Sequence, residues 1–96
     1  MKYIRVKVKY LAPYIKNLIG LDEETITIEG EASLKDLMVK IAEIHGKHIL
    51  TQLLNEGGDR LRESLLTLIN NTVIQDINHK LKDGDTITLL IAIDGG

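Results

Sequence analysis

LKDGDTITLLIAIDGG, residues 81–96, is the stretch that decides the fold of this 96-residue chain. Asp83-Gly84-Asp85 has the composition of a tight turn, because glycine adopts positive φ and aspartate bonds to nearby backbone. The apolar run that follows predicts a strand over residues 86–92. The printed sequence then ends on Gly95-Gly96, two residues without a Cβ. We therefore expect the last strand to lead into a narrow, conformationally free tail.

Working outward from this stretch, four further segments are predicted to be strands. The clearest is the N-terminal one, in which Ile4, Val6, Val8 and Tyr10 alternate with Arg5, Lys7 and Lys9. This period of two is typical of a half-buried strand with a basic outer face. The others cover 25–29, which we expect to pair antiparallel with the first, 65–69 and 72–74. Asn70-Asn71 predicts a two-residue hairpin turn, because asparagine tolerates positive φ.

One long helix is predicted between these strands. Ser33 is a good N-cap with Asp36 three residues later, and Gly46 ends the pattern. The apolar stripe between them is Leu34, Leu37, Met38, Ile41, Ala42 and His45. This spacing places all six on one helix face.

Two shorter helices are also predicted. Pro13 and Gly20 bound the first, with Leu11, Tyr14, Ile15, Leu18 and Ile19 on one face. The second covers 49–54, and Asp22-Glu23-Glu24 is expected to be a charged turn. The pattern predicts a two-layer α+β domain, and the element order fits several small sheets of this class.

Composition and charge narrow the function. The net charge is −2 and the sequence pI is about 5.9, so no basic field favours nucleic acid. The longest apolar run, 89–93, is too short to cross a bilayer, and the N-terminus lacks a signal-peptide core. We therefore expect a cytoplasmic protein. The chain has no cysteine, which excludes disulfides, thiolate metal sites and a cysteine nucleophile.

The one candidate metal motif is His45-Gly46-Lys47-His48. Two imidazoles three residues apart are half of a metal site, but only Glu43 lies nearby and Gly46 breaks the helix that would align them. We expect no metal site and interpret His45 as a helix C-cap residue.

Four features of the chain resemble the ubiquitin-like sulfur-carrier family. This family includes the molybdopterin synthase small subunit, the thiamine sulfur carrier and the ubiquitin-related modifier. The first feature is a first strand that runs into Tyr10-Leu11-Ala12 and a helical turn that closes at Gly20. The second is Asn70-Asn71, where the family has its hairpin. The last two are Leu81-Lys82-Asp83-Gly84-Asp85 before the last strand and the diglycine Gly95-Gly96. The resemblance is closest to the molybdopterin synthase small subunit. It implies a β-grasp (ubiquitin-like) fold with a mixed sheet of four to five strands packed on one main helix. Residues 1–91 would form the domain and 92–96 a flexible tail.

The resemblance also implies chemistry at the terminus. An E1-like enzyme would adenylate the carboxylate of Gly96, with Gly95 as its slim neighbour. Sulfur would then displace AMP to give a thiocarboxylate. ATP and Mg²⁺ would belong to that enzyme, and the chain itself would be a carrier without a tightly bound cofactor. The molybdopterin synthase large subunit is then a further expected partner.

Three alternatives stay open. The molybdopterin-synthase branch commonly carries Pro-Pro shortly before the diglycine, whereas residues 90–94 contain no proline. A protein modifier that joins Gly96 to substrate lysines, or a carrier for transfer-RNA thiolation, therefore remains possible on the sequence, as does a plain interaction module.

Partner contacts are expected beside the tail. Strand alternation predicts that Ile87, Leu89 and Ile91 point toward the helix, and that Leu90 and Ala92 point outward. Together with Ile93 and Asp94 in the tail, Leu90 and Ala92 are the candidate docking residues. The basic stripe on the first strand is a weaker candidate for guiding an acidic partner.

Overall fold

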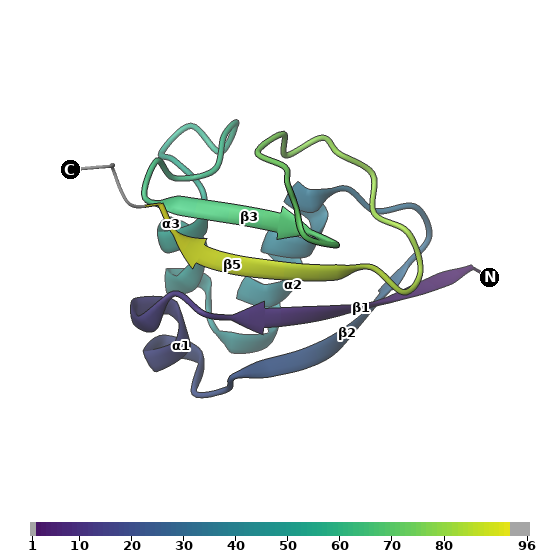
Figure 1. Ribbon diagram of the computed structural model, residues 1–96, viewed down its shortest axis with the longest axis horizontal. Coiled ribbons are helices and arrows are strands. Elements are labelled where there is room, and N and C mark those ends of the chain that lie inside the picture. The colour runs from purple at the N-terminus through teal and green to yellow at the C-terminus, as the bar shows by residue number, and fades with distance from the viewer. Residues whose placement is uncertain (1, 93–96) are drawn as a thin grey trace.

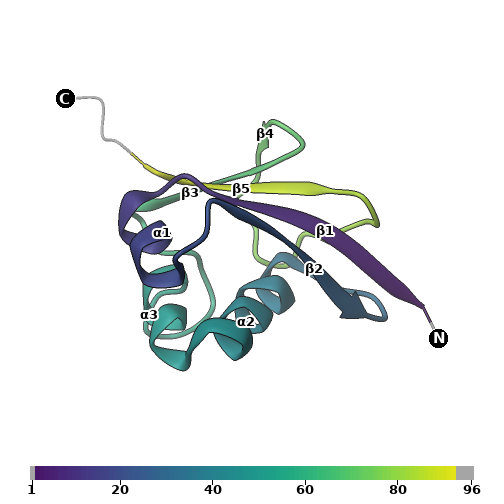
Figure 2. The same ribbon diagram turned by 90° about the horizontal axis from the view of Figure 1, so that it is seen from below.

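The protein is described by a computed structural model, and the structure describes residues 2–92. A five-stranded mixed sheet forms one layer, and helices cover one of its faces (Figures 1 and 2). The strands are β1 (Tyr3–Tyr10), β2 (Glu23–Glu29), β3 (Leu65–Ile69), β4 (Thr72–Val73) and β5 (Thr86–Ile91). The helices are α1 (Pro13–Ile19), α2 (Leu34–His45), the 3₁₀ turn η1 (Lys47–Ile49) and α3 (Leu50–Leu53).

The first and last strands lie side by side at the centre of the sheet. The strand order is β2-β1-β5-β3-β4, and β1 and β5 are parallel, with Lys7 opposite Thr86 and Tyr10 opposite Leu89. The other neighbours are antiparallel. With α2 packed across one face, this is the predicted β-grasp arrangement, and the fold class is confirmed.

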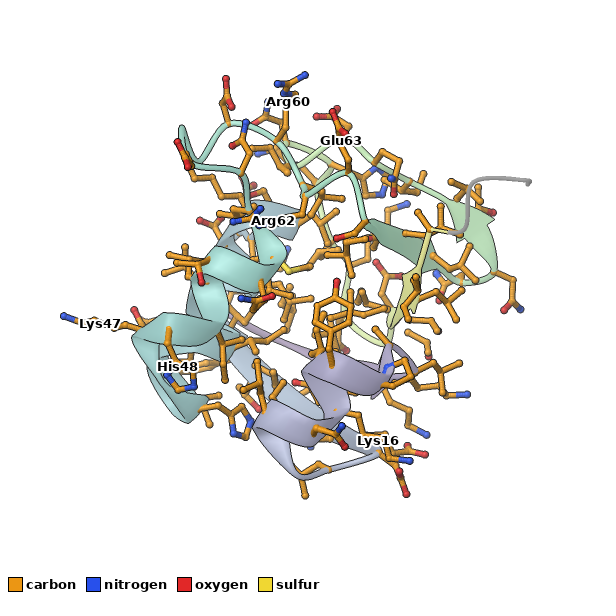
Figure 3. The ribbon with its side chains drawn as sticks, turned by 90° about the vertical axis from the view of Figure 1, so that its left-hand side faces the viewer. Lys16, Lys47, His48, Arg60, Arg62 and Glu63 are labelled. Atoms are coloured by element: carbon orange, nitrogen blue, oxygen red, sulfur yellow. The ribbon has the colours of Figure 1, made fainter. Side chains whose placement is uncertain are left out.

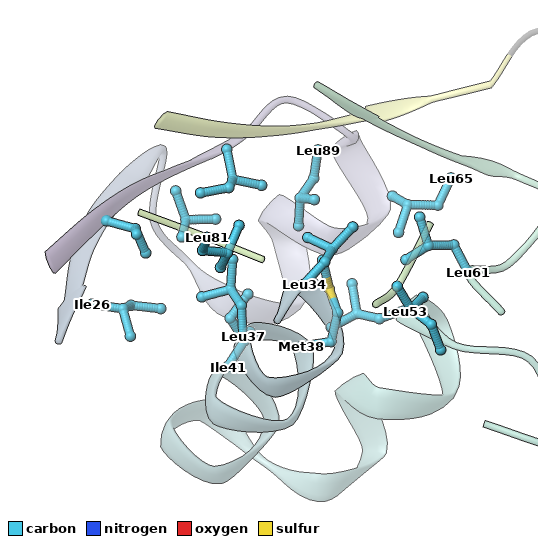
Figure 4. Close-up of a cluster of buried hydrophobic side chains, with 14 of the residues drawn as sticks. Ile26, Leu34, Leu37, Met38, Ile41, Leu53, Leu61, Leu65, Leu81 and Leu89 are labelled. Carbon is cyan, nitrogen blue, oxygen red and sulfur yellow. The ribbon is translucent and has the colours of Figure 1, made fainter. Parts of the chain in front are cut away.

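The helix α2 begins and ends where its caps predict. The Ser33 hydroxyl accepts the Asp36 N–H at 3.2 Å, and the Asp36 carboxylate accepts the Ser33 N–H at 2.8 Å. This reciprocal pair is a capping box. The apolar stripe of α2 joins side chains of the sheet in one buried cluster (Figure 4). Among residues 2–92, no helix is long and apolar enough to cross a membrane.

The helix α1 confirms its predicted limits but only part of its predicted face. Pro13 stands in its first turn, and Gly20 ends it in the left-handed region at φ +83°. Ile15 is fully buried, whereas Leu11 and Leu18 are exposed. Tyr14 and Ile19 are partly buried and pack against the core beside Ile15, so the inner part of the predicted face is confirmed and its two outer leucines are not.

Two other boundaries differ from the prediction. Glu23 and Glu24 belong to β2, because the β1 ladder extends to Lys9 opposite Glu23. The charged segment is therefore mostly strand. The predicted helix over 49–54 is η1 followed by α3, and it starts earlier because the 3₁₀ turn begins directly after Gly46.

The hairpin and the turn before β5 adopt the backbone conformations that their residues predict. Asn70 and Asn71 have φ of +50° and +73°, and Gly84 has φ of +90°. Asparagine and glycine tolerate this left-handed region better than other residues. The hairpin prediction is confirmed, although β4 covers only Thr72–Val73.

Side chains of the turn fasten β5 to its neighbours. The Asp83 carboxylate accepts the Arg5 N–H at 2.8 Å. The Asp85 carboxylate is almost completely buried and accepts the side-chain amide of Asn70 at 2.8 Å. The amide oxygen of Asn70 in turn accepts the Thr86 N–H at 2.9 Å. The sequence motif over 81–85 therefore fixes where β5 enters the sheet.

The far end of β5 is less covered than its middle. Ile87 and Leu89 are fully buried against the helix layer, as predicted. Ile91 follows them in the same alternation, but 39% of its surface is exposed. Alternation along a strand predicts the side of the sheet but not whether a helix covers that side at the strand's end.

Candidate functional site

The candidate site is the end of β5 and the outer face of the sheet beside it. The backbone N–H of Ala92 donates to the Ser64 carbonyl at 2.8 Å, directly after β5 ends. This bond fixes the point from which the chain continues toward the diglycine. The predicted residues Ile93, Asp94, Gly95 and Gly96 lie outside the described residues.

An apolar surface lies on the outer face near this point. Leu90 is directly opposite Leu66 on β3, and Leu68 is directly opposite Val73 on β4. Residues opposite each other in a sheet share a face, so these four side chains form one patch, which we call the outer apolar face. Val73 is 54% exposed and the three leucines are partly buried.

The structure shows which apolar residues lie beside Leu90, the predicted contact residue. Reasoning from the sequence missed these neighbours. In Leu65-Leu66-Thr67-Leu68-Ile69, both alternating sets contain aliphatic residues, so the pattern does not say which set faces outward. The helix layer decides, because Leu65, Thr67 and Ile69 are buried beneath it. Ala92, the other predicted contact within the described residues, is partly buried.

The outer face changes character toward β1. Arg5 and Lys7 are exposed and Lys9 is partly exposed, so the predicted basic stripe is on this face. Lys7 stands opposite Thr86 of β5 and its Nζ lies 3.5 Å from a Glu23 carboxylate oxygen. This ion pair is half exposed and contributes little to stability. The face therefore offers an apolar half and a basic half to a partner.

A wide polar hollow borders the end of β5. It has a volume of about 650 Å³, and its lining includes Arg60, Arg62, Glu63 and Ser64. The Arg62 guanidinium donates to the Thr51 carbonyl, so this side chain is already held. Figure 3 views this end of the molecule and shows Lys16, Lys47 and Arg60 pointing outward and away from one another. Basic side chains that diverge in this way give no converging anion site.

A buried polar cluster lies inside the same end of the domain. The Tyr10 hydroxyl donates to Oε2 of Glu24 at 2.5 Å, and Nε2 of His45 lies 2.5 Å from the same oxygen. Burial, and then the Glu24 carboxylate, raise the pKa of Tyr10 far above its usual value. Tyr10 is therefore a hydrogen-bond donor at any physiological pH. The cluster ties the end of α2 to β1 and β2.

This cluster corrects the interpretation of His45. Its side chain bonds to Glu24 on β2, and the helix is closed by the backbone N–H of Gly46, which donates to the Ala42 carbonyl. Sequence reasoning missed the pair because Glu24 and His45 are far apart in the chain. Within residues 2–92, no three His, Asp or Glu side chains gather in a way that could hold a metal ion.

Comparison with known proteins decides the family. A family model described as the ThiS family matches residues 8–96, which is nearly the whole chain and includes both glycines. The chain belongs to the ThiS family. It is thus a member of the ubiquitin-like sulfur carriers, and the resemblance drawn from the sequence motifs is confirmed. A comparison with curated proteins finds no match.

Solved structures agree with this membership. A protein assigned as molybdopterin converting factor subunit 1 from Pyrococcus furiosus is 26% identical, with 94% of this chain and 99% of that one covered and a TM-score of 0.71. A chain in the complex of subunits 1 and 2 of molybdopterin-converting factor from Helicobacter pylori is 27% identical, with 97% of this chain and 100% of that one covered and a TM-score of 0.53. Small archaeal modifier protein 1 from Methanosarcina acetivorans shares the fold at 22% identity, covering 100% of both chains, at 0.76.

Proposed function

We propose that this ThiS-family chain is a sulfur carrier that serves as the small subunit of molybdopterin synthase. An E1-like enzyme adenylates the Gly96 carboxylate, and sulfur transfer then gives a thiocarboxylate. The observation that carries the proposal is the family match, which extends through Gly95-Gly96. The last described strand before these glycines, β5, ends beside the outer apolar face. Two structures with molybdopterin-converting names at 26% and 27% identity favour this branch.

The chemistry explains why an activating partner is needed. A carboxylate is a poor electrophile, because its charge repels nucleophiles and oxide is a bad leaving group. A Gly96 carboxylate oxygen attacks the α-phosphorus of ATP and pyrophosphate leaves. A sulfur nucleophile on the partner side then attacks the acyl carbon and AMP leaves. ATP and Mg²⁺ belong to the E1-like enzyme, where metal and cationic groups stabilise the developing charge.

In this proposal, one part of the chain contacts the activating enzyme and another part reaches its active site. The outer apolar face, with Leu90 at its end, supplies the contact with the enzyme. Beyond Ala92, four extended residues span at most about 14 Å. This length is enough to enter a neighbouring active site, provided that the enzyme sits directly against the end of β5. A narrow diglycine is what such an entry requires.

A second candidate is a protein modifier. In this case a lysine amine attacks the acyl carbon of the adenylate, and an isopeptide bond forms as AMP leaves. The observation in its favour is that residues 90–94 contain no proline where the molybdopterin-synthase branch commonly has two. Both candidates share the first step.

The decisive test of that first step is ATP–pyrophosphate exchange by a cognate E1-like enzyme. We expect exchange with the parent chain and its loss with Gly96→Ala or with one added C-terminal residue. A matched control is Gly57→Ala, which changes a glycine outside the tail that does not need positive φ and should preserve exchange. Normal exchange by the extended variant would overturn the proposal.

The two candidates differ in the product. Intact mass measurement of protein from its native host should show oxygen replaced by sulfur at the terminus, together with a copurifying pterin-binding subunit. Higher-mass conjugates that vanish when Gly96 is deleted would instead favour the modifier.

A further inference from the structure

The edge strand β2 leaves a row of backbone groups open. In the β1–β2 ladder, the Gly30 N–H donates to the Lys2 carbonyl and the Tyr10 N–H to the Asp22 carbonyl, each at 2.7 Å. Bonded pairs alternate along an antiparallel ladder, so residues 24, 26 and 28 also bond to β1. The N–H and C=O groups of Glu23, Thr25, Thr27 and Glu29 therefore point away from the sheet. Within residues 2–92, no bond uses these groups of Thr25 or Thr27.

The two edges of the sheet differ in this respect. β4, at the opposite edge, covers only Thr72–Val73 and has little backbone to offer. β2 runs from Glu23 to Glu29 without a proline or a bulge in its register with β1. Edge strands of this length with β-branched residues are templates for another strand. Here the template is the segment Thr25-Ile26-Thr27-Ile28.

A groove lies between residues of β2 and α2. These two elements are neighbours below the sheet edge in Figure 2. The groove has a volume of about 330 Å³, and its apolar floor is formed by Ile28 of β2 and Val39 of α2, both only partly buried. A side chain from the inner face of an added strand would be next to Ile28 and would enter this groove.

The rim of the groove is acidic. Glu29, Glu31, Asp36 and Glu43 line it with a single basic residue, Lys40. Lys40 Nζ lies 3.9 Å from the Glu43 carboxylate, and Lys80 Nζ binds Glu31 at 3.0 Å. Glu29 has no ion pair within residues 2–92. The excess negative charge favours a basic occupant.

The acidic residues at the two ends of β2, Glu23 and Glu29, disfavour a second copy of this chain as the occupant. If two β2 strands paired antiparallel with full overlap about Ile26, Thr25 would be opposite Thr27 and Glu23 would be opposite Glu29 of the other copy. Like charges directly opposite one another destabilise a sheet. Basic residues at those two positions of a different strand would stabilise it, because Glu29 has no ion pair within residues 2–92 and Glu23 has only the half-exposed pair with Lys7.

We propose that β2 and the β2–α2 groove bind an extended segment of a partner protein, which adds to the sheet as an antiparallel strand. The segment carries lysine or arginine at two positions six residues apart, opposite Glu23 and Glu29. Aliphatic side chains lie between them, and one of these fills the groove beside Ile28 and Val39. Backbone bonds to Thr25 and Thr27 supply affinity, and the groove and the acidic rim supply specificity. This surface lies at the β2 edge of the sheet, whereas the outer apolar face is formed by β5, β3 and β4.

The test uses an acetylated, amidated peptide of sequence KVTVTVK, titrated to about 1 mM into isotope-labelled protein and followed by amide chemical shifts. We expect saturable shifts concentrated in β2 and α2, and no binding of the matched peptide EVTVTVE. Equal binding of both peptides, or no binding of KVTVTVK, would overturn the proposal.

Two variant pairs locate the contact. Thr27→Pro removes an edge N–H that β1 does not use, a position where edge strands tolerate proline, and it should abolish binding. Thr27→Val keeps this N–H and should bind normally. Glu29→Lys should weaken binding about fivefold or more, whereas Glu56→Lys, outside the groove, should not. If Thr27→Pro fails to fold, Glu29→Lys decides.

Two further results would contradict the proposal. One is undiminished binding to a folded Thr27→Pro protein. The other is a stable dimer in sedimentation, with protected Thr25 and Thr27 amides, because a second copy would then occupy the edge.

Discussion

The start and the end of β5 are held in different ways. At the start, the buried Asp85 carboxylate accepts the side chain of Asn70 and the Lys82 N–H, each at 2.8 Å. At the end, Ile91 is 39% exposed, and beyond the ladder with β3 one backbone bond joins Ala92 to Ser64. The dense bonding at one end sets the register of the strand. The other end can therefore remain uncovered for a partner without loss of the fold. Four changes would break or sharpen this contrast.

The largest expected effect is on stability at the start of β5. Asp85→Ala leaves the Asn70 amide and the Lys82 N–H without their acceptor, and we expect a loss of about 3 kcal/mol in the free energy of unfolding. Asp83→Ala is the matched control, because its carboxylate accepts one exposed N–H, and should cost about 1 kcal/mol. Urea unfolding measures both. Equal losses would remove the contrast between a buried anchor and an ordinary turn.

Next is the effect of a charge on the outer apolar face. Leu90→Asp should lower the rate of adenylation by the E1-like enzyme about tenfold or more, because a charge is brought into an apolar contact. Its free energy of unfolding should change by less than about 1 kcal/mol. Asn78→Asp adds the same charge in a distant turn and should leave adenylation unchanged. If Leu90→Asp unfolds the domain, the end of β5 is as structural as its start.

A smaller effect concerns the cluster beneath the uncovered end. The raised pKa of Tyr10 means that the unfolded chain loses this proton first as pH rises past the ordinary value of 10.0. Stability from this group is therefore complete below about pH 10 and falls above it by about 1.4 kcal/mol per pH unit. Tyr10→Phe should remove that part of the slope. Urea unfolding of both proteins from about pH 9 to about pH 11 measures it. Parallel slopes for the parent and Tyr10→Phe proteins would contradict the role given to burial.

The smallest effect lies between the two ends. Thr67 is fully buried opposite Leu89, and its hydroxyl has no hydrogen-bond partner within residues 2–92. Thr67→Val keeps the shape and removes an unpaired polar group, so we expect stability to rise by about 1 kcal/mol. Thr88→Val, on the outer face, should change it by less than about 0.5 kcal/mol. A decrease for Thr67→Val in thermal unfolding would mean that the hydroxyl is paired.

The sequence predicted those features that depend on neighbouring residues. Alternation gave β1 and β2, the Ser33 capping box gave the start of α2, and Asn70-Asn71 gave the hairpin. Features that depend on distant residues were missed. Nothing local to His45 points to Glu24, and nothing in the pattern of β3 says that Leu66 faces outward.

Of the residues of the candidate site, those close together in the sequence were predicted, and those brought together by the fold were not. Leu90 was predicted because its strand and the tail are contiguous in sequence. Its companions on β3 and β4, and the groove beneath β2, exist only once the sheet is assembled. The chemistry assigned to Gly96 came from the motifs and stays a prediction, because that residue lies outside the described part of the chain.

The parallel pair at the centre of the sheet has a consequence for folding. β1 is synthesised first, yet one of its two neighbours is β5, the last strand to be made. The contact from Lys7 to Thr86 closes a loop that spans most of the chain, and contacts of such long range slow folding. Leu90 pairs with Leu66 of β3, which lies much closer to it in the sequence than β1 does. The β3–β5 part of the sheet, and the outer apolar face with it, can therefore assemble before the centre of the sheet closes.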